Sequence, residues 1–513
     1  MCSPLCTLCI LYCTLGPTLS SSAATPARNL ISPRITVRGG DASFRDAANR
    51  SVLFHGINYV KKESPYVPSA TAPGEVDKLR SLGATVVRLG VMLSGVFPGP
   101  CGATAPNMTY LRLIREQVDT LWTEAGIRSV LDLHQDVLNG DRLCGEGVPD
   151  WMVNASELGS LNFPLPLSTQ NESVPDPATG GWAPKLDCSA RGPLKFIGWS
   201  SFYMTDASGK TFQQLYDGTS TLAKYVERYW VAVAAYFRGH DGVLAYELLN
   251  EPWVGDHVKH PLLLLEAGAA ERGGVGTYMK RMHAAVRSVD PDTFTLFAPA
   301  EVNNRLMRHV GYEAGFLPGE PMAFHTYCIT GTDGPGPTTP LAIGVCHLND
   351  GLQLKHRRDD LQRLATAGIV TEFGAVSDAA TGLAEVRYVA EHFDGPGMPL
   401  SWIYWNNIPD QDDYRAELAR SYPRAVAGDV VSVSFNASNG DFTLVFVPDK
   451  EASLPTEVFL SRQHHYPKGW DVTVTPEGCC DVKDVPGGVE VRVGTPPGSS
   501  ISATVGVRVV AKA

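Results

Sequence analysis

An apolar run that stops abruptly at polar residues occupies positions 246–253, which read YELLNEPW. The run ends in an amide, a carboxylic acid and a proline, as a buried parallel strand does when it delivers polar groups to the rim of a barrel. Residues 368–374, GIVTEFG, have the same form. Either glutamate alone could instead begin a helix, where a negative charge is favourable. Together, Glu251 and Glu372 predict paired carboxylate chemistry at two strand ends.

Short apolar segments alternate with helical patterns along most of the chain. We expect eight strands, at 55–59, 85–89, 129–134, 244–249, 293–297, 322–325, 368–371 and 400–405. Between them, apolar residues recur at the three-four spacing of a helix face, as in Leu111, Ile114, Val118, Leu121 and Trp122. This alternation predicts an α/β fold, a parallel (β/α)8 TIM barrel with its site at the C-terminal strand ends. A doubly wound sheet is the alternative, but no glycine-rich phosphate turn follows the first strand.

Other segments flank or interrupt the barrel, which we place at 30–420. Residues 1–24 hold a short apolar segment followed by small residues, which predicts a signal peptide, with an uncleaved anchor as the alternative. A hairpin over 34–37 and 51–54 is expected to floor the barrel. The long insertion at about 139–209 is rich in aromatic residues, including Trp182, Phe196 and Trp199. We expect it to line an apolar trough over the rim or to form a mini-core of its own.

The C-terminal part of the chain, 421–513, alternates apolar and polar residues in short runs separated by Gly and Pro. This pattern predicts an antiparallel β-sandwich. The sandwich carries no cluster of catalytic residue types, so we expect it to buttress the barrel.

Composition and cysteine usage limit the function classes. A net charge of −11 argues against nucleic-acid binding, because no basic surplus is present to displace counterions. Neither an HExxH motif nor a pair of CxxC motifs occurs, so we expect no metal and no other cofactor. Seven cysteines follow the predicted signal peptide, and we expect disulfides Cys328–Cys346 and Cys101–Cys144. Sequons at Asn49, Asn107, Asn154, Asn171 and Asn436 agree with a secreted or lumenal protein of the secretory or endolysosomal pathway.

The predicted strand ends carry the candidate active site, which comprises Arg88, His134, Asn250, Glu251, His325, Tyr327, Glu372 and Trp405. Two carboxylates about 5 to 5.5 Å apart cleave glycosides with retention, one as nucleophile and one as acid/base. We expect Arg88 and Tyr327 to keep a nucleophilic Glu372 ionised. Loss of solvent and repulsion between the carboxylates would keep Glu251, the acid/base, protonated.

The other candidate residues would hold substrate. Asn250 is placed to hold the sugar 2-hydroxyl, and Trp405 offers a flat floor for the sugar ring. For His134 and His325, a satisfied histidine of the core is the alternative.

The sequences NEP at 250–252 and TEFG at 371–374, with the other candidate site residues, resemble glycoside hydrolase family five, of clan A. The resemblance covers about residues 55–407. The segments GINYVKK at 56–62, LDLHQDV at 131–137 and YPRAVAG at 422–428 resemble the endoglycoceramidases within this family. The resemblance implies a retaining double displacement, and it adds Lys62 and Asp136 as candidate sugar contacts.

The resemblance also implies a substrate, since its members release the glycan from ceramide or cleave glucosylceramide or steryl glucosides. We expect an endoglycoceramidase-like hydrolase of glycosphingolipids, monomeric and in peripheral contact with a membrane surface. The alternatives are a β-glucosidase for glucosylceramide or steryl glucoside, a secreted polysaccharide endoglucanase, and a non-catalytic binder of lipid or carbohydrate.

Overall fold

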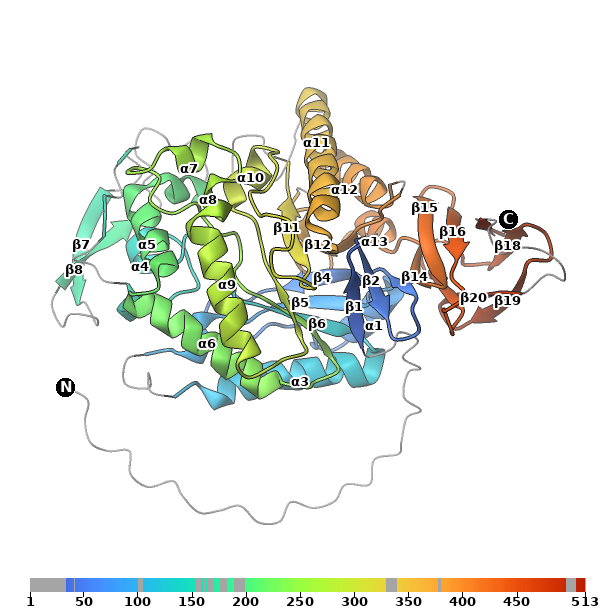
Figure 1. Cartoon of the computed structure of the whole chain (residues 1–513), viewed down its shortest axis with the longest axis horizontal. Coiled ribbons are helices and arrows are strands. Elements are labelled where there is room, and N and C mark those ends of the chain that lie inside the picture. The colour runs from blue at the N-terminus through green and yellow to red at the C-terminus, as the bar shows by residue number, and fades with distance from the viewer. Residues whose placement is uncertain are drawn as a thin grey trace, which may run out of the picture.

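A computed structural model of the chain describes residues 34–40, 42–99, 105–153, 158–160, 163–164, 169–175, 182–188, 199–328, 339–376, 380–395, 397–494 and 504–512. Within these ranges, a barrel wrapped in helices adjoins a smaller body made of strands (Figure 1). The predicted signal peptide, the sequon at Asn154 and the residues Phe196 and Ile197 lie outside the described residues.

The eight predicted strands form one parallel sheet. They are β4 (His55–Tyr59), β5 (Val86–Gly90), β6 (Arg128–Asp132), β9 (Val243–Glu247), β10 (Phe294–Leu296), β11 (Met322–Thr326), β12 (Gly368–Phe373) and β13 (Ser401–Tyr404). Their order is β10-β9-β6-β5-β4-β13-β12-β11, and a parallel bridge between Phe297 and Met322 joins the two ends. The sheet therefore closes, which confirms the (β/α)8 barrel and excludes a doubly wound sheet.

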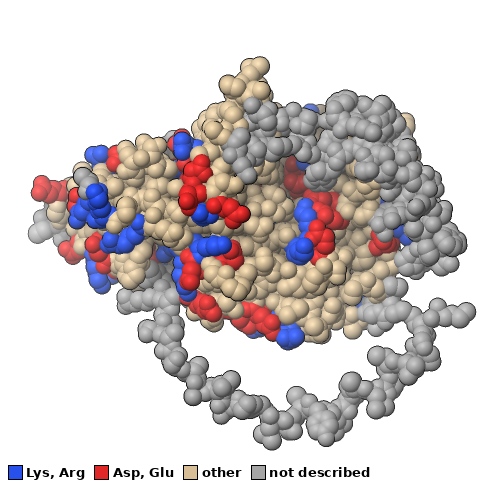
Figure 2. Space-filling model, turned by 180° about the vertical axis from the view of Figure 1, so that it is seen from behind, with Lys and Arg blue, Asp and Glu red and all other residues tan. Residues whose placement is uncertain are grey.

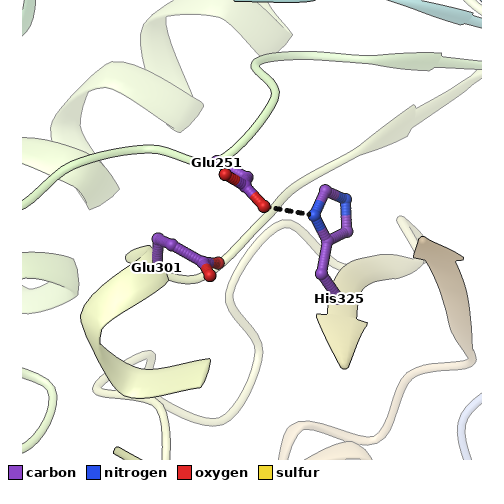
Figure 3. A group of neighbouring side chains, drawn as sticks. All are labelled: Glu251, Glu301 and His325. Atoms are coloured by element: carbon purple, nitrogen blue, oxygen red, sulfur yellow. Dashed lines mark hydrogen bonds and ion pairs between the residues drawn. The ribbon is translucent and has the colours of Figure 1, made fainter. Parts of the chain in front are cut away.

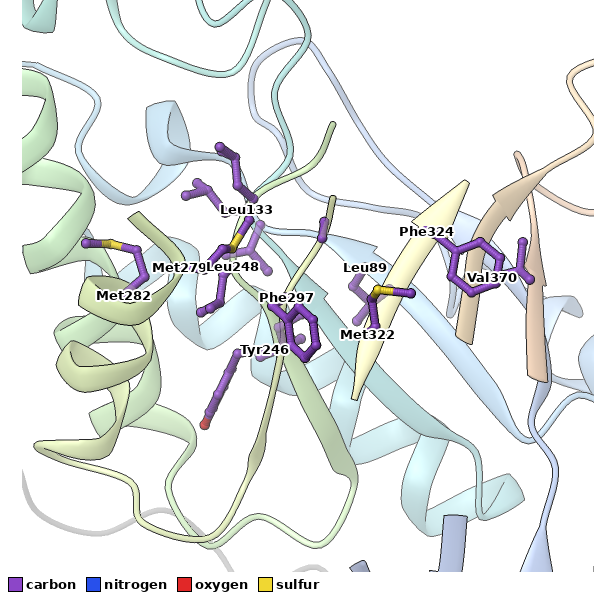
Figure 4. Packing of buried hydrophobic residues seen from close by; sticks show 14 of the residues in the cluster. Leu89, Leu133, Tyr246, Leu248, Met279, Met282, Phe297, Met322, Phe324 and Val370 are labelled. Atoms are coloured by element: carbon purple, nitrogen blue, oxygen red, sulfur yellow. The ribbon is translucent and has the colours of Figure 1, made fainter. Parts of the chain in front are cut away.

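Helices cover the barrel (Figure 1). The longer ones are α3 (Met108–Ala125), α5 (Asp206–Asp217), α6 (Thr221–Phe237), α9 (Gly274–Arg287), α11 (Pro340–Leu364) and α12 (Ala380–Phe393), and the shorter ones are α1 (Glu75–Ser81), α2 (Leu93–Val96), α7 (Leu262–Leu265), α8 (Ala269–Arg272), α10 (Glu301–Arg305) and α13 (Asp412–Leu418). On α3 the predicted stripe Leu111, Ile114, Val118 and Leu121 is buried. Met279 and Met282 of α9 lie in the same apolar cluster as Tyr246 and Leu248, near the end of strand β9 (Figure 4). Helix periodicity in the sequence thus identifies the faces that hold the barrel.

The insertion between β6 and α5 is described only in part. It contains α4 (Gly140–Leu143), a 3-10 turn at Asp150–Met152, a hairpin of β7 (Thr169–Pro175) with β8 (Trp182–Asp187), and a second 3-10 segment at Trp199–Met204. Met152, Phe202 and Tyr203 are buried within the barrel's own apolar cluster. Among the described side chains, these three residues therefore belong to the core, and they line neither a trough nor a separate mini-core. The side chains of Trp182 and Trp199 lie outside the described part.

The C-terminal strands form two antiparallel sheets around a shared core. They are β14 (Tyr422–Val426), β15 (Gly428–Asn436), β16 (Asp441–Pro448), β17 (Thr456–Phe459), β18 (Trp470–Thr475), β19 (Cys480–Val485), β20 (Gly488–Val493) and β21 (Val505–Ala511). Phe442, Leu444 and Phe446 of one sheet pack with Val489 and Val491 of the other, as the predicted sandwich requires. Strand β19 does not follow the alternating pattern of the other strands, because its side chains are largely exposed.

The N-terminal hairpin joins this C-terminal part. Strands β1 (Ile35–Arg38), β2 (Ser43–Asp46) and β3 (Ser51–Val52) continue the sheet in the order β1-β2-β3-β14-β17-β20-β19. The prediction that 34–37 pairs with 51–54 is wrong, because β2 lies between these two strands and pairs with both. Phe44, Val52 and Phe54 also pack against Val86 and Ile403 at the N-terminal ends of the barrel strands. The hairpin therefore covers the floor of the barrel and belongs to a sheet completed by residues nearly 400 positions later.

Two disulfides occur in the described part of the chain. Cys328–Cys346 confirms one prediction. The prediction Cys101–Cys144 is wrong, because Cys144 pairs with Cys188. Cys144 closes α4 and Cys188 directly follows β8, so the insertion is crosslinked within itself; Cys101 lies outside the described residues. Cys479 and Cys480 are free.

A buried arginine links the barrel to the C-terminal body. Arg420 contacts Asp394 at 2.5 Å and Glu417 at 2.7 Å, and it donates to the carbonyl oxygen of Phe435 at 3.1 Å. All three side-chain groups of these ion pairs are buried. The pairing matters because a buried charge without its counterion is strongly unfavourable.

We therefore expect Arg420→Met to lower the free energy of unfolding by about 3 kcal/mol, since Asp394 would lose its ion-pair partner and Glu417 would keep only Arg387. Denaturant unfolding followed by tryptophan fluorescence measures the change. Arg508→Met is the control, because the Arg508–Asp441 pair is exposed and its loss should cost about 0.5 kcal/mol or less. Equal effects of the two substitutions would contradict the prediction.

Candidate active site

The turn after β9 holds Asn250 and Glu251 in a fixed conformation. Glu251 has a φ of 39°, in the left-handed region that a residue with a side chain adopts only when its surroundings enforce it. Gln135 supplies that constraint. Its amide donates to the carbonyl oxygens of Asn250 at 2.6 Å and Glu251 at 3.3 Å, and Asn250 donates back to the carbonyl of Gln135 at 2.9 Å. The loop after β6 thus aims the Glu251 carboxylate.

The two predicted catalytic glutamates share a histidine neighbour. Nδ1 of His325 lies 2.9 Å from Oε1 of Glu251 and 3.5 Å from Oε2 of Glu372. The two carboxylate oxygens therefore lie no further apart than the sum of these distances. All three side chains are buried. This close approach is of the kind that retaining glycosidases need, with carboxyl groups about 5 to 5.5 Å apart.

Arg88 forms the base of the site. Its fully buried guanidinium contacts Glu372 at 2.5 Å, Glu247 at 2.6 Å and Asp132 at 3.0 Å. It also donates to the Oδ1 atoms of Asn250 at 2.8 Å and Asn58 at 3.1 Å. Although burial disfavours its charge, the three carboxylates outweigh that cost and raise the pKa of Arg88. A permanent cation therefore lies against Glu372, where sequence analysis expected it.

Tyr327 completes the surroundings of Glu372. Its hydroxyl donates to Oε2 of Glu372 at 2.6 Å, while Arg88 holds Oε1. Burial, followed by the charge of Glu372, raises the pKa of Tyr327 well above its ordinary value, so the phenol keeps its proton. Both oxygens of the expected nucleophile thus accept hydrogen bonds, which favours the ionised carboxylate.

The protonation of Glu251 differs from the expectation. Burial alone would raise the pKa of Glu251, but the hydrogen bond and the charge of His325 outweigh it and lower that pKa. Burial opposes the charged form of His325 as well, yet Glu372 and Glu251 together raise its pKa to about 9. In the free protein the proton shared by Glu251 and His325 therefore lies on the histidine. A single hydrogen bond joins this histidine to Glu251, the expected acid/base.

A third carboxylate borders this pair. Glu301, at the start of α10, is buried and points toward Glu251 and His325 (Figure 3). Burial and the negative charge of Glu251 raise the pKa of Glu301 to about 7, although Arg305 and His325 oppose the rise. Glu301 accepts hydrogen bonds from Asn304 at 2.9 Å and Arg305 at 3.1 Å. Its charge near neutral pH thus bears directly on the acid/base.

These three groups are also close enough together to suit a metal ion. One ligand atom each from Glu251, Glu301 and His325 lies within 4.8 Å of the others, and no other such group occurs among the described residues. A metal held there would occupy the atoms that exchange the proton between His325 and Glu251. The hydrogen-bonded pair of His325 and Glu251 is interpreted as an acid/base unit.

The remaining predicted residues gather beside Asp132, another partner of Arg88. Nδ1 of His134 contacts Asp132 at 2.8 Å, and Nε2 lies 3.4 Å from Asp136. Burial disfavours the charged ring, but these two carboxylates raise the pKa of His134 to about 9. Lys62 contacts Asp136 at 2.5 Å and Glu146 at 2.6 Å. Lys62, which the resemblance alone indicated, thus belongs to the same cluster.

Trp405 lies against this cluster. Its ring stacks on His134 at 5.3 Å between centroids, and the ammonium of Lys62 lies 5.3 Å from its centroid. A cavity of about 300 Å³ lies next to Lys62 and is lined by Val67, Ser69 and Asn406 among others, but not by Trp405 itself. A flat aromatic face next to charged groups and an open space suits a sugar ring.

Sequence analysis missed several members of the site. Glu247 lies within an apolar strand, and a charged residue in such a run signals a buried ion pair. Glu301 follows the fifth barrel strand, so the strand-end rule that found the other residues would have found it too. Glu146 left no signal, because it belongs to the insertion and is brought beside Asp136 by a bridge between the two backbones.

A closed barrel with two confronting glutamates over a buried arginine defines a retaining glycosidase. Residues 198–411 match the cellulase family, glycosyl hydrolase family 5, and residues 420–504 match the glycoside hydrolase family 5 C-terminal domain. An endoglycoceramidase of Hydra vulgaris is 30% identical over 84% of this chain and 81% of its own length. One of Cyanea nozakii is 29% identical over 90% of this chain and 92% of its own. The chain belongs to the endoglycoceramidases of glycoside hydrolase family 5.

A solved structure has the same fold. Endo-glycoceramidase II from Rhodococcus sp. superposes with a TM-score of 0.69 at 23% identity, covering 91% of this chain and 99% of that one. The likeness spans both the barrel and the C-terminal sheets.

Removing the Tyr327 hydroxyl should weaken catalysis without unfolding the protein. Tyr327→Phe leaves one oxygen of Glu372 without its donor, and a hydrogen bond to a charged group is worth about 1.5 to 3 kcal/mol. We therefore expect kcat/KM to fall roughly tenfold to a hundredfold. Tyr246→Phe is the matched control, because that hydroxyl binds Asp290 away from the site at 2.9 Å. A similar loss in both variants would contradict the assignment.

Removing the Glu301 charge should shift the pH dependence. Above pH 7 Glu301 is ionised, and its negative charge stabilises the protonated form of the His325–Glu251 pair. Glu301→Gln removes that charge, so the pair should lose its proton at a lower pH. We expect the alkaline limb of kcat/KM to move down by on the order of one pH unit, with little change below pH 6. Glu313→Gln, which removes an exposed carboxylate, should leave the profile unchanged. An unchanged profile for Glu301→Gln would show that its charge does not act on the pair.

Proposed function

We propose that this protein is a secreted or lumenal endoglycosidase that cleaves the β-glycosidic bond between glycan and ceramide in glycosphingolipids. The observation that carries the proposal is Glu251 and Glu372 meeting at His325, with Arg88 and Tyr327 on Glu372. The Hydra vulgaris and Cyanea nozakii relatives are named endoglycoceramidases, and one structure of the Rhodococcus enzyme is a ganglioside GM3 complex. These names support the substrate class.

The first step forms a bond from Glu372 to the anomeric carbon and breaks the bond to the ceramide oxygen. Glu372 attacks as a carboxylate, and its charge, held by Arg88 and Tyr327, passes to the departing oxygen. A primary alkoxide is a poor leaving group, so it must receive a proton as the bond breaks. The proton on His325 crosses the 2.9 Å hydrogen bond to Glu251, which delivers it to the oxygen.

The second step reverses these roles. Glu251, now a carboxylate, takes a proton from water, and the resulting hydroxide attacks the anomeric carbon as Glu372 leaves. The configuration at that carbon is inverted twice and therefore retained. His325, with a pKa of about 9, keeps a proton available to Glu251 through the neutral pH range.

Residues around the sugar supply orientation. We assign Asn250 to the 2-hydroxyl, since its amide lies beside the nucleophile on Arg88. Lys62, Asp136 and His134 are assigned to further hydroxyls, and Trp405 to the ring face. Contacts of this kind accelerate the reaction only to the extent that they strengthen in the transition state.

Compartment and assembly are part of the proposal. Two disulfides in the described part of the chain support an oxidising compartment. We further propose a monomer that meets its substrate at a membrane surface through peripheral contact. A glucosidase for glucosylceramide or steryl glucoside, or a polysaccharide endoglucanase, would use the same glutamates and differ in product.

The test is product analysis with ganglioside GM3, glucosylceramide and soluble β-glucan as separate substrates. We expect intact oligosaccharide and ceramide from the ganglioside, and Glu372→Gln should lower that turnover by on the order of a thousandfold or more. Glu313→Gln serves as the matched control. Release of single sugars only, or hydrolysis of glucan alone, would replace the proposal with one of the alternatives.

Leaving-group dependence separates the two glutamates. Glu251→Gln removes the acid, so it should impair ganglioside cleavage far more than the first step on an aryl glycoside whose phenol leaves without a proton. Glu372→Gln should abolish both reactions. Equal losses on both substrates for Glu251→Gln would overturn the acid assignment.

A further inference from the structure

We propose that the exposed face of α11 is a docking surface for the lipid layer that holds the substrate. This inference rests on the proposed function. The face consists of Leu341, Val345, Leu348 and Leu352, which recur at the three-four spacing that aligns side chains along one side of a helix. Leu341 is 80% exposed and Leu348 72% exposed. Soluble proteins rarely expose a continuous apolar stripe of this kind without a partner.

The same half of the helix lacks exposed charge. From Pro340 to Leu354 the only Lys, Arg, Asp or Glu is Asp350, and that side chain is buried. In the space-filling view the projecting tip of the molecule carries neither blue nor red atoms (Figure 2). Charge resumes at Lys355, one turn further toward the barrel. An apolar tip followed by charged residues suits insertion at the boundary of a lipid layer.

The buried side of these helical turns is fixed to the active site. Cys346 is bonded to Cys328, the residue after Tyr327. Gln353 donates to the carbonyl oxygen of His325 at 2.6 Å, and Asp350 accepts from Thr326 at 2.9 Å. One side of these helical turns therefore supports His325 and Tyr327, and the docking face is the other side of the same turns. Both lie at the rim where the aglycone must leave.

Neighbouring loops extend the surface. Of the seven exposed leucines in the described part of the chain, six follow barrel strands β9, β10 or β11, namely Leu262, Leu265, Leu306, Leu341, Leu348 and Leu352. Three consecutive loops thus present leucines on the catalytic rim. In Figure 1, α7 and α11 both lie on the upper edge of the molecule. Such concentration on the face through which a ceramide would enter favours lipid over a second copy of the chain.

The mode of binding is attachment to one face of the layer. Within the described residues, no helix is both long and apolar enough to cross a membrane. Leucine side chains on a helix end reach the boundary between headgroups and acyl chains, and the affinity grows with the apolar area they bury.

Vesicle binding without glycolipid tests the inference separately from the reaction. Full-length protein is sedimented with phosphatidylcholine vesicles, and Leu341→Gln/Leu348→Gln is compared with Leu454→Gln, which alters the one exposed leucine of the C-terminal body. We expect the double variant to bind at least tenfold more weakly and the control to bind like the wild type. On a water-soluble aryl glycoside all three proteins should turn over equally, which establishes that the double variant is folded.

Each other outcome has a defined meaning. Wild-type protein that does not bind the vesicles, or a double variant that binds equally well, overturns the docking surface. A concentration-dependent dimer of the wild type that the double variant abolishes assigns the face to a second copy instead. If the wild type binds vesicles but releases no glycan from embedded ganglioside, the proposed function fails while the docking surface stands.

Discussion

A single buried guanidinium is the constraint on which the active site depends. Arg88 has no access to solvent, so its charge exists only because Asp132, Glu247 and Glu372 surround it. Removing water from an ion costs several kcal/mol, which only well-placed counterions and hydrogen bonds offset. The arginine therefore requires carboxylates from three strands at fixed positions. One of those carboxylates, Glu372, is the proposed nucleophile, so the pairing that stabilises the barrel interior would also prepare the reaction.

The charges continue outward from Arg88 in alternating order. In one direction they pass through Asp132, His134 and Asp136 to Lys62. In the other they pass through Glu372 and His325 to Glu251. Each carboxylate in these two series contacts at least one cation. The neighbouring carboxylates in turn raise the pKa of both histidines, His134 and His325, in spite of their burial. The groups assigned to the sugar and those assigned to the aglycone belong to one electrostatic system.

Sequence alone predicted those parts of the site that follow from strand ends. The barrel and the residues at or near its strand ends could be predicted because parallel strands end at one rim; these residues are His134, Asn250, Glu251, His325, Tyr327, Glu372 and Trp405. Arg88 was predicted as well, although it lies in the middle of β5. The pKa of Glu251 could not be predicted, since it depends on a 2.9 Å contact with a residue 74 positions away. The disulfide of Cys144 was missed for a related reason, because its partner follows a hairpin inside an insertion whose pattern did not reveal strands. Long-range contacts within irregular segments cannot be predicted in this way, because such segments show no hydrophobic periodicity in the sequence.

The pairing of β3 with β14 has a consequence for synthesis of the chain. Val52 and Ala425 are partners in that ladder, so the floor of the barrel stays incomplete until a strand more than 370 positions further along the chain has been made. Until then the ribosome-bound intermediate exposes Phe44 and Phe54 together with an unpaired strand edge, a combination that invites association with other chains.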